Sequence, residues 1–216
     1  GLISGTSVGT PVGIVGSFVA DGLGGITSGS EDITDSTSHR QLTITSTSGA
    51  YSVGADGRGC VTLTYPGPTT STFHFVLGGV AANNAPAGVA STGRMVEFDD
   101  YSGTGLQPRV SGVLRRQTLA AYSSGTTAAL ATRYAFGQDG ADFGNGHFAL
   151  AGSISLDPVT GLLSNGVFDA SDQGSTQTNI TGMTGSITGV SSTTGRALLT
   201  TTSTGGTFNS AIYIVN

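Results

Sequence analysis

GSFVADGLGGITSG at residues 16–29 returns in altered form as GSISLDPVTGLLSNG at residues 152–166, and this internal repeat decides the fold. Each copy alternates apolar and small polar residues around a turn, the pattern of two strands joined as a β-hairpin. Three residue pairs share a spacing of 136 positions: Gly16 and Gly152, Asp21 and Asp157, and Gly25 and Gly161. A repeat of this kind indicates that one supersecondary plan was copied, so the two copies are expected to pack alike.

The repeat continues downstream at spacings of 136 to 138 positions. The later pairs are Asp32 and Asp169, Asp35 and Asp172, Gly49 and Gly185, and Arg58 and Arg196. A unit of this length is close to the commonest domain size. The sequence therefore predicts a first β-repeat at residues 1–117 and a second at residues 133–216. The segment 118–132 between them is rich in Ala, Ser and Thr and is predicted to be a linker.

Composition favours an all-β chain. Among 216 residues there are 36 glycines and no lysine, and Glu occurs only at Glu31 and Glu97, so the residues that cover exposed helix faces are scarce. Short alternating runs such as VTLTY at residues 61–65 are separated by Gly-rich turns, which indicates sequential hairpins. We expect two tandem antiparallel β-meander domains, each a barrel or a sandwich.

Two expected strands of the first copy carry aromatic residues. TFHFVLG places Phe73 and Phe75 on one face, and RMVEFDD at 94–100 is predicted to turn Val96 and Phe98 inward. The second copy ends at FNSAIYIVN without a counterpart of RMVEFDD, so it is predicted to lack its last strands. An incomplete sheet leaves an edge that must be paired, covered or charged. Three outcomes stay open: a longer repeat array, one sheet shared by both copies, or completion by another molecule.

The strings GSFVADGLGGITSGSEDI and SGAYSVGADGRGCVTLT, followed by FHFVL, MVEFDD and SGVLRRQ, resemble a tandem β-repeat of predicted secreted or surface proteins of acidobacteria. In that family a Tyr-Ala-Phe start leads into GSFTADGxGxIT and GxYxVxxDGRGTxTLT hairpins. The resemblance is close in the first copy and loose in the second, where Pro158 takes a turn position and STTGR replaces ADGRG. It implies modular β-domains that are exported from the cell, and it brings no established activity.

Charge and hydropathy argue against two classes of partner. The formal net charge is −5, the pI is about 4.8, and the arginines are scattered along the sequence, whereas nucleic-acid binders gather basic residues on one face. No run approaches eighteen consecutive apolar residues, so no transmembrane helix is expected. Cys60 is the single cysteine, and no intrachain disulfide can form.

Catalytic signatures are not evident in the sequence. His39, His74 and His147 fall in different expected elements, and no G-x-S-x-G nucleophile elbow occurs. Cys60 stands where the resembled family has Thr, and the alternation puts it on the polar face of a strand. We expect no catalytic residue and no enzymatic activity.

Acidic clusters raise the question of a calcium site. Asp139, Asp142 and Asn145 lie close together in the sequence, and DITD at 32–35 is repeated as DASD at 169–172. None of these matches an EF-hand loop or a glycine-rich nonapeptide repeat. Asp at strand ends ordinarily accepts hydrogen bonds from turn N–H groups, which accounts for the repeated positions. No metal and no other cofactor is therefore predicted.

Two functional hypotheses follow. The first is a secreted or cell-surface structural or adhesive protein that associates with copies of itself, with open sheet edges completed by strands of neighbouring subunits to build a filament. The second is a lipocalin-like cup that binds a small ligand, its cavity lined by Val61, Phe73, Phe75 and Phe98.

Overall fold

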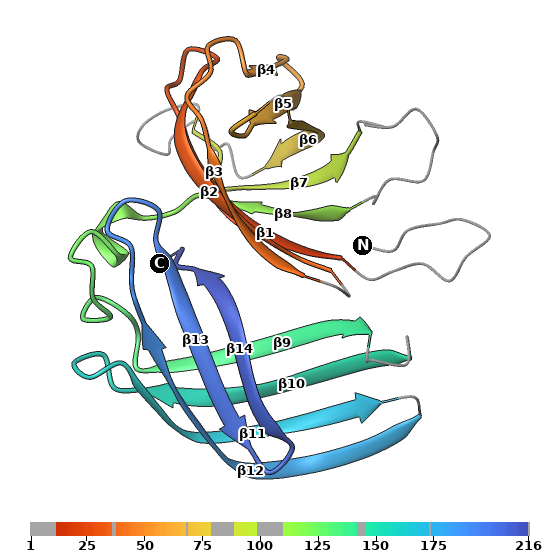
Figure 1. The fold of residues 1–216 in the computed structure, drawn as a ribbon, viewed down its shortest axis with the longest axis vertical. Coiled ribbons are helices and arrows are strands. Elements are labelled where there is room, and N and C mark those ends of the chain that lie inside the picture. The colour runs from red at the N-terminus through yellow and green to blue at the C-terminus, as the bar shows by residue number, and fades with distance from the viewer. Residues whose placement is uncertain are drawn as a thin grey trace. The chain divides into compact units, whose positions relative to one another are not determined.

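The computed structural model describes residues 12–35, 38–67, 69–78, 89–98, 110–141, 146–172 and 174–215. These residues form fourteen β-strands and one short 3-10 turn at Leu119–Ala121 (Figure 1). Every strand pairing is antiparallel, and within each sheet neighbouring strands follow one another in the sequence. The prediction of an all-β chain of antiparallel meanders is confirmed. The chain divides into two compact units, residues 1–116 and residues 117–216.

The first unit contains two sheets. Its three-stranded sheet has the order β1-β2-β3 and its five-stranded sheet the order β4-β5-β6-β7-β8. The strands are β1 (Gly13–Ala20), β2 (Ile26–Thr34), β3 (His39–Ile44), β4 (Tyr51–Val53), β5 (Arg58–Thr64), β6 (Thr70–Gly78), β7 (Thr92–Glu97) and β8 (Ser111–Arg115). Its buried core draws side chains from both sheets, including Ile26 and Ile44 from one and Val61 and Phe73 from the other.

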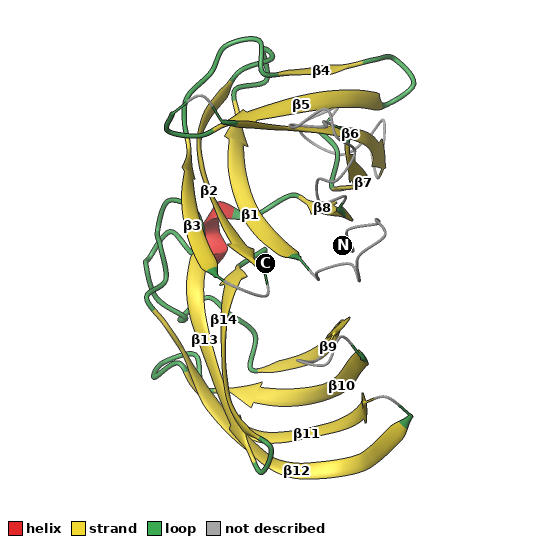
Figure 2. Cartoon of the chain, turned by 45° about the vertical axis from the view of Figure 1, so that its right-hand side comes forward, coloured by secondary structure: helices red, strands yellow, loops and turns green. Residues whose placement is uncertain are grey.

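The second unit is one six-stranded meander of order β14-β13-β12-β11-β10-β9. The strands are β9 (Arg133–Ala141), β10 (His147–Leu156), β11 (Leu162–Asp172), β12 (Ser175–Thr188), β13 (Arg196–Ser203) and β14 (Gly206–Tyr213). The sheet curls into a half-barrel (Figure 2). Its core includes Leu156, Phe168 and Ala197.

The segment expected to be a linker contributes to the core of the second unit. Ala121, Tyr122 and Leu130 are buried in the same cluster as the strand residues of that unit. Gln117, which was expected to end the first repeat, belongs to the second unit, and its side chain donates hydrogen bonds to the carbonyls of Thr194 and Ile214. Because Ala, Ser and Thr predominate here, the few apolar residues of residues 118–132 gave little periodicity from which burial could be predicted.

The two units keep the same register at the repeated hairpin. Gly16 of β1 lies opposite Glu31 of β2, and Gly152 of β10 lies opposite Phe168 of β11. A Cβ on Gly16 would come within 3.2 Å of the Glu31 Cβ, and a Cβ on Gly152 would come within 2.6 Å of the Phe168 Cβ. The backbone carbonyl oxygens of Ser30 and Val167 would be closer still, so glycine is needed at both positions because the neighbouring strand's backbone, together with the Cβ of the opposite residue, occupies the space.

The side chains of β7 and the following Phe98 point to the faces opposite to those predicted. Val96 and Phe98 are 46% and 63% exposed, whereas Glu97 lies opposite the buried Phe73 and its Oε2 is buried. Adjacent Met95 and Val96 are both apolar, so the sequence alone does not say which of them faces the core. Pairing with β6 decides it, because residues opposite one another on neighbouring strands share a face.

Candidate functional site

The edges of the six-stranded sheet are the first candidate site. Among the described residues β14 pairs only with β13, and β9 pairs only with β10. β14 has the sequence GTFNSAIY, which carries no charge and no proline, and Phe208 within it is 53% exposed. Natural edge strands usually carry Lys, Pro or a bulge that prevents pairing with another chain. β14 has no charge or proline to discourage a further strand.

The repeat shows which neighbour each open edge would take. β6 is the counterpart of β14, and in its own sheet β6 pairs with β7 on the side away from β5. β10 is the counterpart of β1, and it pairs with β9 on the side away from β11. Within the described part of the chain, β1 and β14 each lack the neighbour that the matching strand of the other unit has. These two edges are therefore equivalent to positions at which this fold accepts an antiparallel strand.

A buried carboxyl group is the second candidate. Glu31 is 4% exposed and accepts a hydrogen bond of 3.0 Å from the hydroxyl of Tyr65, which is 3% exposed. Burial raises the pKa of Glu31 to about 7; the Tyr65 hydrogen bond opposes this rise, and the nearby Glu97 and Asp32 carboxylates add to it. Burial likewise raises the pKa of Tyr65. Below pH 7 Glu31 is therefore mainly protonated, and its proton lies in the core of the first unit.

Sequence reasoning missed this cluster. Glu31 and Glu97 are far apart in the sequence, and each stands in a strand whose partner decides which face is covered. One signal was available, because Glu31 occupies the repeat position of Phe168, a core residue of the second unit. A carboxyl at a position that is aromatic in the other copy indicates a buried acid.

Asp32, the neighbour of Glu31 on β2, has a different partner. Its side chain is 2% exposed, and its Oδ1 lies 3.0 Å from Nε2 of His39, a side chain that is half exposed. Successive side chains of a strand point to opposite faces, so Asp32 and Glu31 do not share one pocket. The pair therefore lacks the facing geometry that two carboxylates need to act across a glycosidic bond.

The turn aspartates bind the backbone of their own turns. Asp21 Oδ1 accepts hydrogen bonds from the N–H groups of Leu23 and Gly25, at 2.7 and 2.8 Å. Its repeat partner Asp157 accepts from the N–H of Val159 at 2.9 Å. These backbone hydrogen bonds lower the pKa of Asp21; for Asp157 the hydroxyl of Thr160 contributes most to the lowered pKa, followed by Val159. Both aspartates thus accept the turn hydrogen bonds expected from their positions.

The calcium candidates fall partly outside the described residues. Asp142 and Asn145 lie there, and Asp139 is exposed on β9. In DITD, Asp35 accepts a hydrogen bond from the N–H of Ser38, and in DASD, Asp169 accepts one from the N–H of Asn179. No group of three or more His, Cys, Asp or Glu side chains that could hold a metal occurs in the part of the chain that the structure describes.

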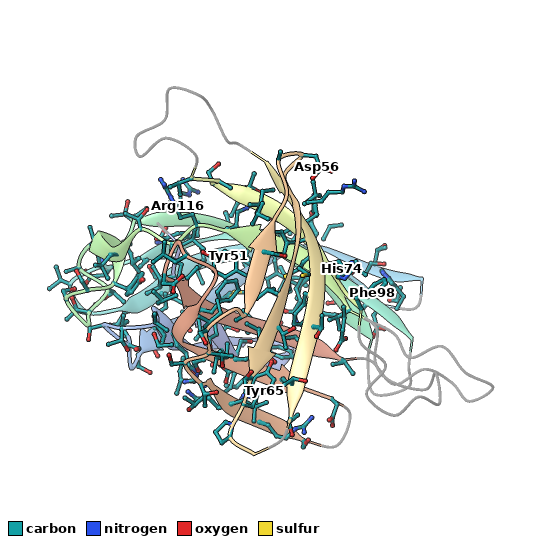
Figure 3. All side chains as sticks on the ribbon, turned by 90° about the horizontal axis from the view of Figure 1, so that it is seen from above. Tyr51, Asp56, Tyr65, His74, Phe98 and Arg116 are labelled. Carbon is teal, nitrogen blue, oxygen red and sulfur yellow. The ribbon has the colours of Figure 1, made fainter. Side chains whose placement is uncertain are left out.

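The histidines and the cysteine lie on separate strands. His39 is on β3, His74 on β6 and His147 on β10, and all three are exposed. His74 stacks on Phe98 with ring centroids 3.8 Å apart and an angle of 14° between the planes (Figure 3). Cys60 is half buried, lies opposite His74, and its Sγ is 3.5 Å from the Ser52 hydroxyl.

The residues expected to line a ligand cup lie on two faces of the sheet. Val61 and Phe73 are each 2% exposed and pack in the core, with Phe75 packed against them. Phe98 is on the opposite face with His74. The four side chains therefore do not surround one common cavity.

Comparison with known proteins yields no relative. No protein family model, no curated protein and no solved structure matches this chain. Among the described residues, no helix is long and apolar enough to cross a membrane.

Proposed function

We propose that this chain is an extracellular structural protein whose copies assemble by pairing of strand edges, without enzymatic activity. The observation that carries the proposal is the edge of β14, which has no neighbour on one side within the described residues, is eight residues long and lacks the charges and prolines that discourage strand addition. The resemblance of the repeat to exported β-modules supports the extracellular location.

The edge of β1, which also lacks a neighbour on one side within the described residues, gives the assembly a direction. β14 of one copy and β1 of the next are different surfaces, so a contact between them is heterologous. Heterologous contacts that do not close into a ring generate an open polymer. Backbone hydrogen bonds supply the affinity in such strand additions, and the side chains of the two edges set the register.

The test is a double substitution on β14, Phe208→Lys with Ser210→Lys, because both side chains are exposed and inserted charge is the usual protection of an edge. We expect the unaltered chain to form concentration-dependent oligomers in analytical ultracentrifugation and filaments in electron microscopy. The double variant should weaken association by about tenfold or more, which corresponds to roughly 1.4 kcal/mol.

A matched control adds the same charge elsewhere. Val159→Lys with Thr204→Lys places two lysines at exposed turn positions of the same unit. This control should assemble as the unaltered chain does, and circular dichroism should show both variants folded. A chain that stays monomeric at every concentration, or a β14 variant that assembles normally, would overturn the proposal.

A further inference from the structure

Three of the eight arginines, scattered in the sequence, lie on one face of the five-stranded sheet. Arg58, Val76, Arg94 and Val113 are successive cross-strand partners on β5, β6, β7 and β8, and Arg115 follows two residues after Val113. This face, which we call the arginine face, is the one turned away from the core. It consists of Arg58, Val76, Arg94, Val96, Val113 and Arg115, with Cys60, His74 and Phe98 beside them.

The arginine face combines positive charge with exposed apolar surface. Val76 and Val96 are each 46% exposed and Val113 is 51% exposed. The residues of β5 to β8 that point to this face include no Asp or Glu. Arg58 is paired with Asp56 of the adjoining turn at 2.7 Å, while Arg94 and Arg115 form no ion pair within the described residues. Uncovered valines beside Arg94 and Arg115, which form no ion pair within the described residues, indicate a protein partner that carries carboxylates.

A second copy of this chain has the required charge. The chain as a whole carries a net charge of −5, so the surface outside the arginine face is more acidic than the average. Two arginine faces would repel one another, which excludes a symmetric contact through this face. The modest charge of the face also suits a folded partner with a few carboxylates better than a long polyanion, whose binding requires many basic groups.

The complementary surface lies on the second unit, on the outward side of β9, β10 and β11. We call it the aspartate face: Ala135, Gly137 and Asp139 of β9, Ala149 and Ala151 of β10, and Asp169 of β11. These residues alternate with Phe136, Leu150 and Phe168, which pack in the core. Small residues leave the sheet open to close approach, and Asp139 and Asp169 are exposed, while Arg133 lies at the other end of β9.

We propose that the arginine face of one copy packs on the aspartate face of a second copy. The inference rests on the proposed self-assembly and deepens it by adding a face-to-face contact to the strand pairing. Strand spacing and rise place Arg94 and Arg115 about 8 Å apart and Asp139 and Asp169 about 12 Å apart, a difference that flexible arginine side chains can span. Stacked sheets then bury the valines against the small residues of the aspartate face.

A pair of introduced thiols provides the test. Val113 is the cross-strand partner of Arg94 and lies two residues from Arg115 on the arginine face, and Ala151 is the cross-strand partner of Asp169 on the aspartate face. In the variant Val113→Cys with Ala151→Cys, in which Cys60 is replaced by Ser, a short bismaleimide that spans the roughly 10 Å between stacked sheets should give covalent oligomers. Mass spectrometry should show peptides in which the reagent joins the thiols introduced at positions 113 and 151, which we call the engineered link. The control has Val159→Cys in place of Ala151→Cys and so puts the second thiol on an exposed turn, where we expect at least fivefold less of the corresponding cross-link.

Charge variants of the protein with Val113→Cys and Ala151→Cys separate specific docking from random collision. Adding Arg94→Gln with Arg115→Gln should lower the yield of the engineered link about fivefold, as expected for the loss of about 1 kcal/mol in two exposed ion pairs. Adding Arg40→Gln with Arg116→Gln changes the net charge equally at exposed sites off the face and should leave the yield unchanged. The yield should also fall at high salt.

The experiment distinguishes failure of face docking from failure of strand pairing. If the faces dock but the strand edges do not pair, the engineered link still forms when Phe208→Lys and Ser210→Lys are added, and no long filaments are seen. If the edges pair but the faces do not dock, filaments form, and Ala151→Cys gives no more cross-link to position 113 than Val159→Cys does. The second result, or a yield of the engineered link that Arg94→Gln with Arg115→Gln leaves unchanged, would overturn the inference.

Discussion

One repeated stretch of sequence has a different structure in each of the two units. In the second unit β12 is a single strand from Ser175 to Thr188, which pairs with β11 through three shifts of register and with β13 near its end. In the first unit the corresponding stretch is divided into β3 and β4, and the sheet is divided with it. Pairing beyond the break is kept, because Tyr51 lies opposite Val61 as Ile187 lies opposite Leu199.

An aligned pair of glycines marks the difference. Gly49 has φ of +66° and lies in the turn between β3 and β4, whereas Gly185 is part of β12. A Cβ on Gly49 would meet nothing within 4 Å, while one on Gly185 would meet the backbone carbonyl of Thr200. Glycine is thus used for backbone conformation in one unit and for close strand approach in the other.

A second aligned pair shows how the cores diverge. Glu31 and Phe168 face their respective glycines in the same register, but one is a carboxyl bound by Tyr65 and the other is an aromatic core residue. The repeat thus keeps its hairpin register while the chemistry of its core changes.

The largest effect is expected from Gly185→Val. The added side chain would collide with the backbone of β13, which cannot move without breaking the sheet, so the free energy of unfolding of the second unit should fall by about 3 kcal/mol or more. Gly49→Val should cost the first unit about 1–2 kcal/mol through left-handed backbone strain alone. Hydrogen exchange by mass spectrometry assigns each loss to its unit.

Gly205→Val is the control for Gly185→Val. Its Cβ would meet only the Ser203 hydroxyl, at 3.7 Å, and its φ is not in the left-handed region. A loss for Gly205→Val as large as that for Gly185→Val would contradict the steric interpretation of β12.

The next largest effect is expected from Glu31, which makes the free energy of unfolding of the first unit depend on pH. Its pKa rises from an ordinary 4.5 to about 7 on folding, so the folded first unit binds this proton more tightly than the unfolded chain. The stabilisation is fully present below pH 4.5 and is lost as pH rises through 7, by about 3 kcal/mol in all. Glu31→Gln removes the ionisation and should make the first unit more stable than the unaltered chain at pH 8 and about equally stable at pH 4.

Urea unfolding followed by circular dichroism from pH 4 to pH 8, with hydrogen exchange to locate the unit, measures this difference. The second unit has Phe168 at the same position, so its stability should be the same in the Glu31→Gln variant and the unaltered chain. Parallel pH profiles for the first unit of both proteins would show that Glu31 does not carry a raised pKa.

The smallest effect is expected from the turn aspartates, where the two units are alike. Asp21→Asn and Asp157→Asn each keep an oxygen that can accept the turn hydrogen bonds but lose the charge. Each should lower the melting temperature slightly and to a similar extent, less than any substitution above. Because the pKa of both groups is lowered, the difference from the unaltered chain should vanish as pH falls through the range in which these carboxylates protonate. A large loss at one position alone would show that the two turns are not equivalent.

Some candidate sites could be assigned from the sequence and others could not, depending on how far apart in the chain the interacting residues lie. Asp21 and Asp157 could be assigned as turn acceptors because their partners are two to four residues away. Glu31 could not be paired with Tyr65, 34 residues later, and Arg94 could not be placed beside Arg115, because both neighbours depend on strand pairing. The prediction that Val96 points inward was wrong for the same reason, because pairing with β6 decides which side chains of β7 face the core.

The sequence by itself determined that this chain is all-β, that it is built on a duplicated hairpin plan, and that turn aspartates recur at matching positions. Alternation and turn chemistry act over a few residues, and these features are readable without a partner strand. Only the tertiary structure decided that the first meander divides into two sheets, that Glu31 is buried, and that three arginines share a face. Those outcomes depend on which strands pair and which face is covered, because a shift of one residue moves every side chain of a strand to the other side.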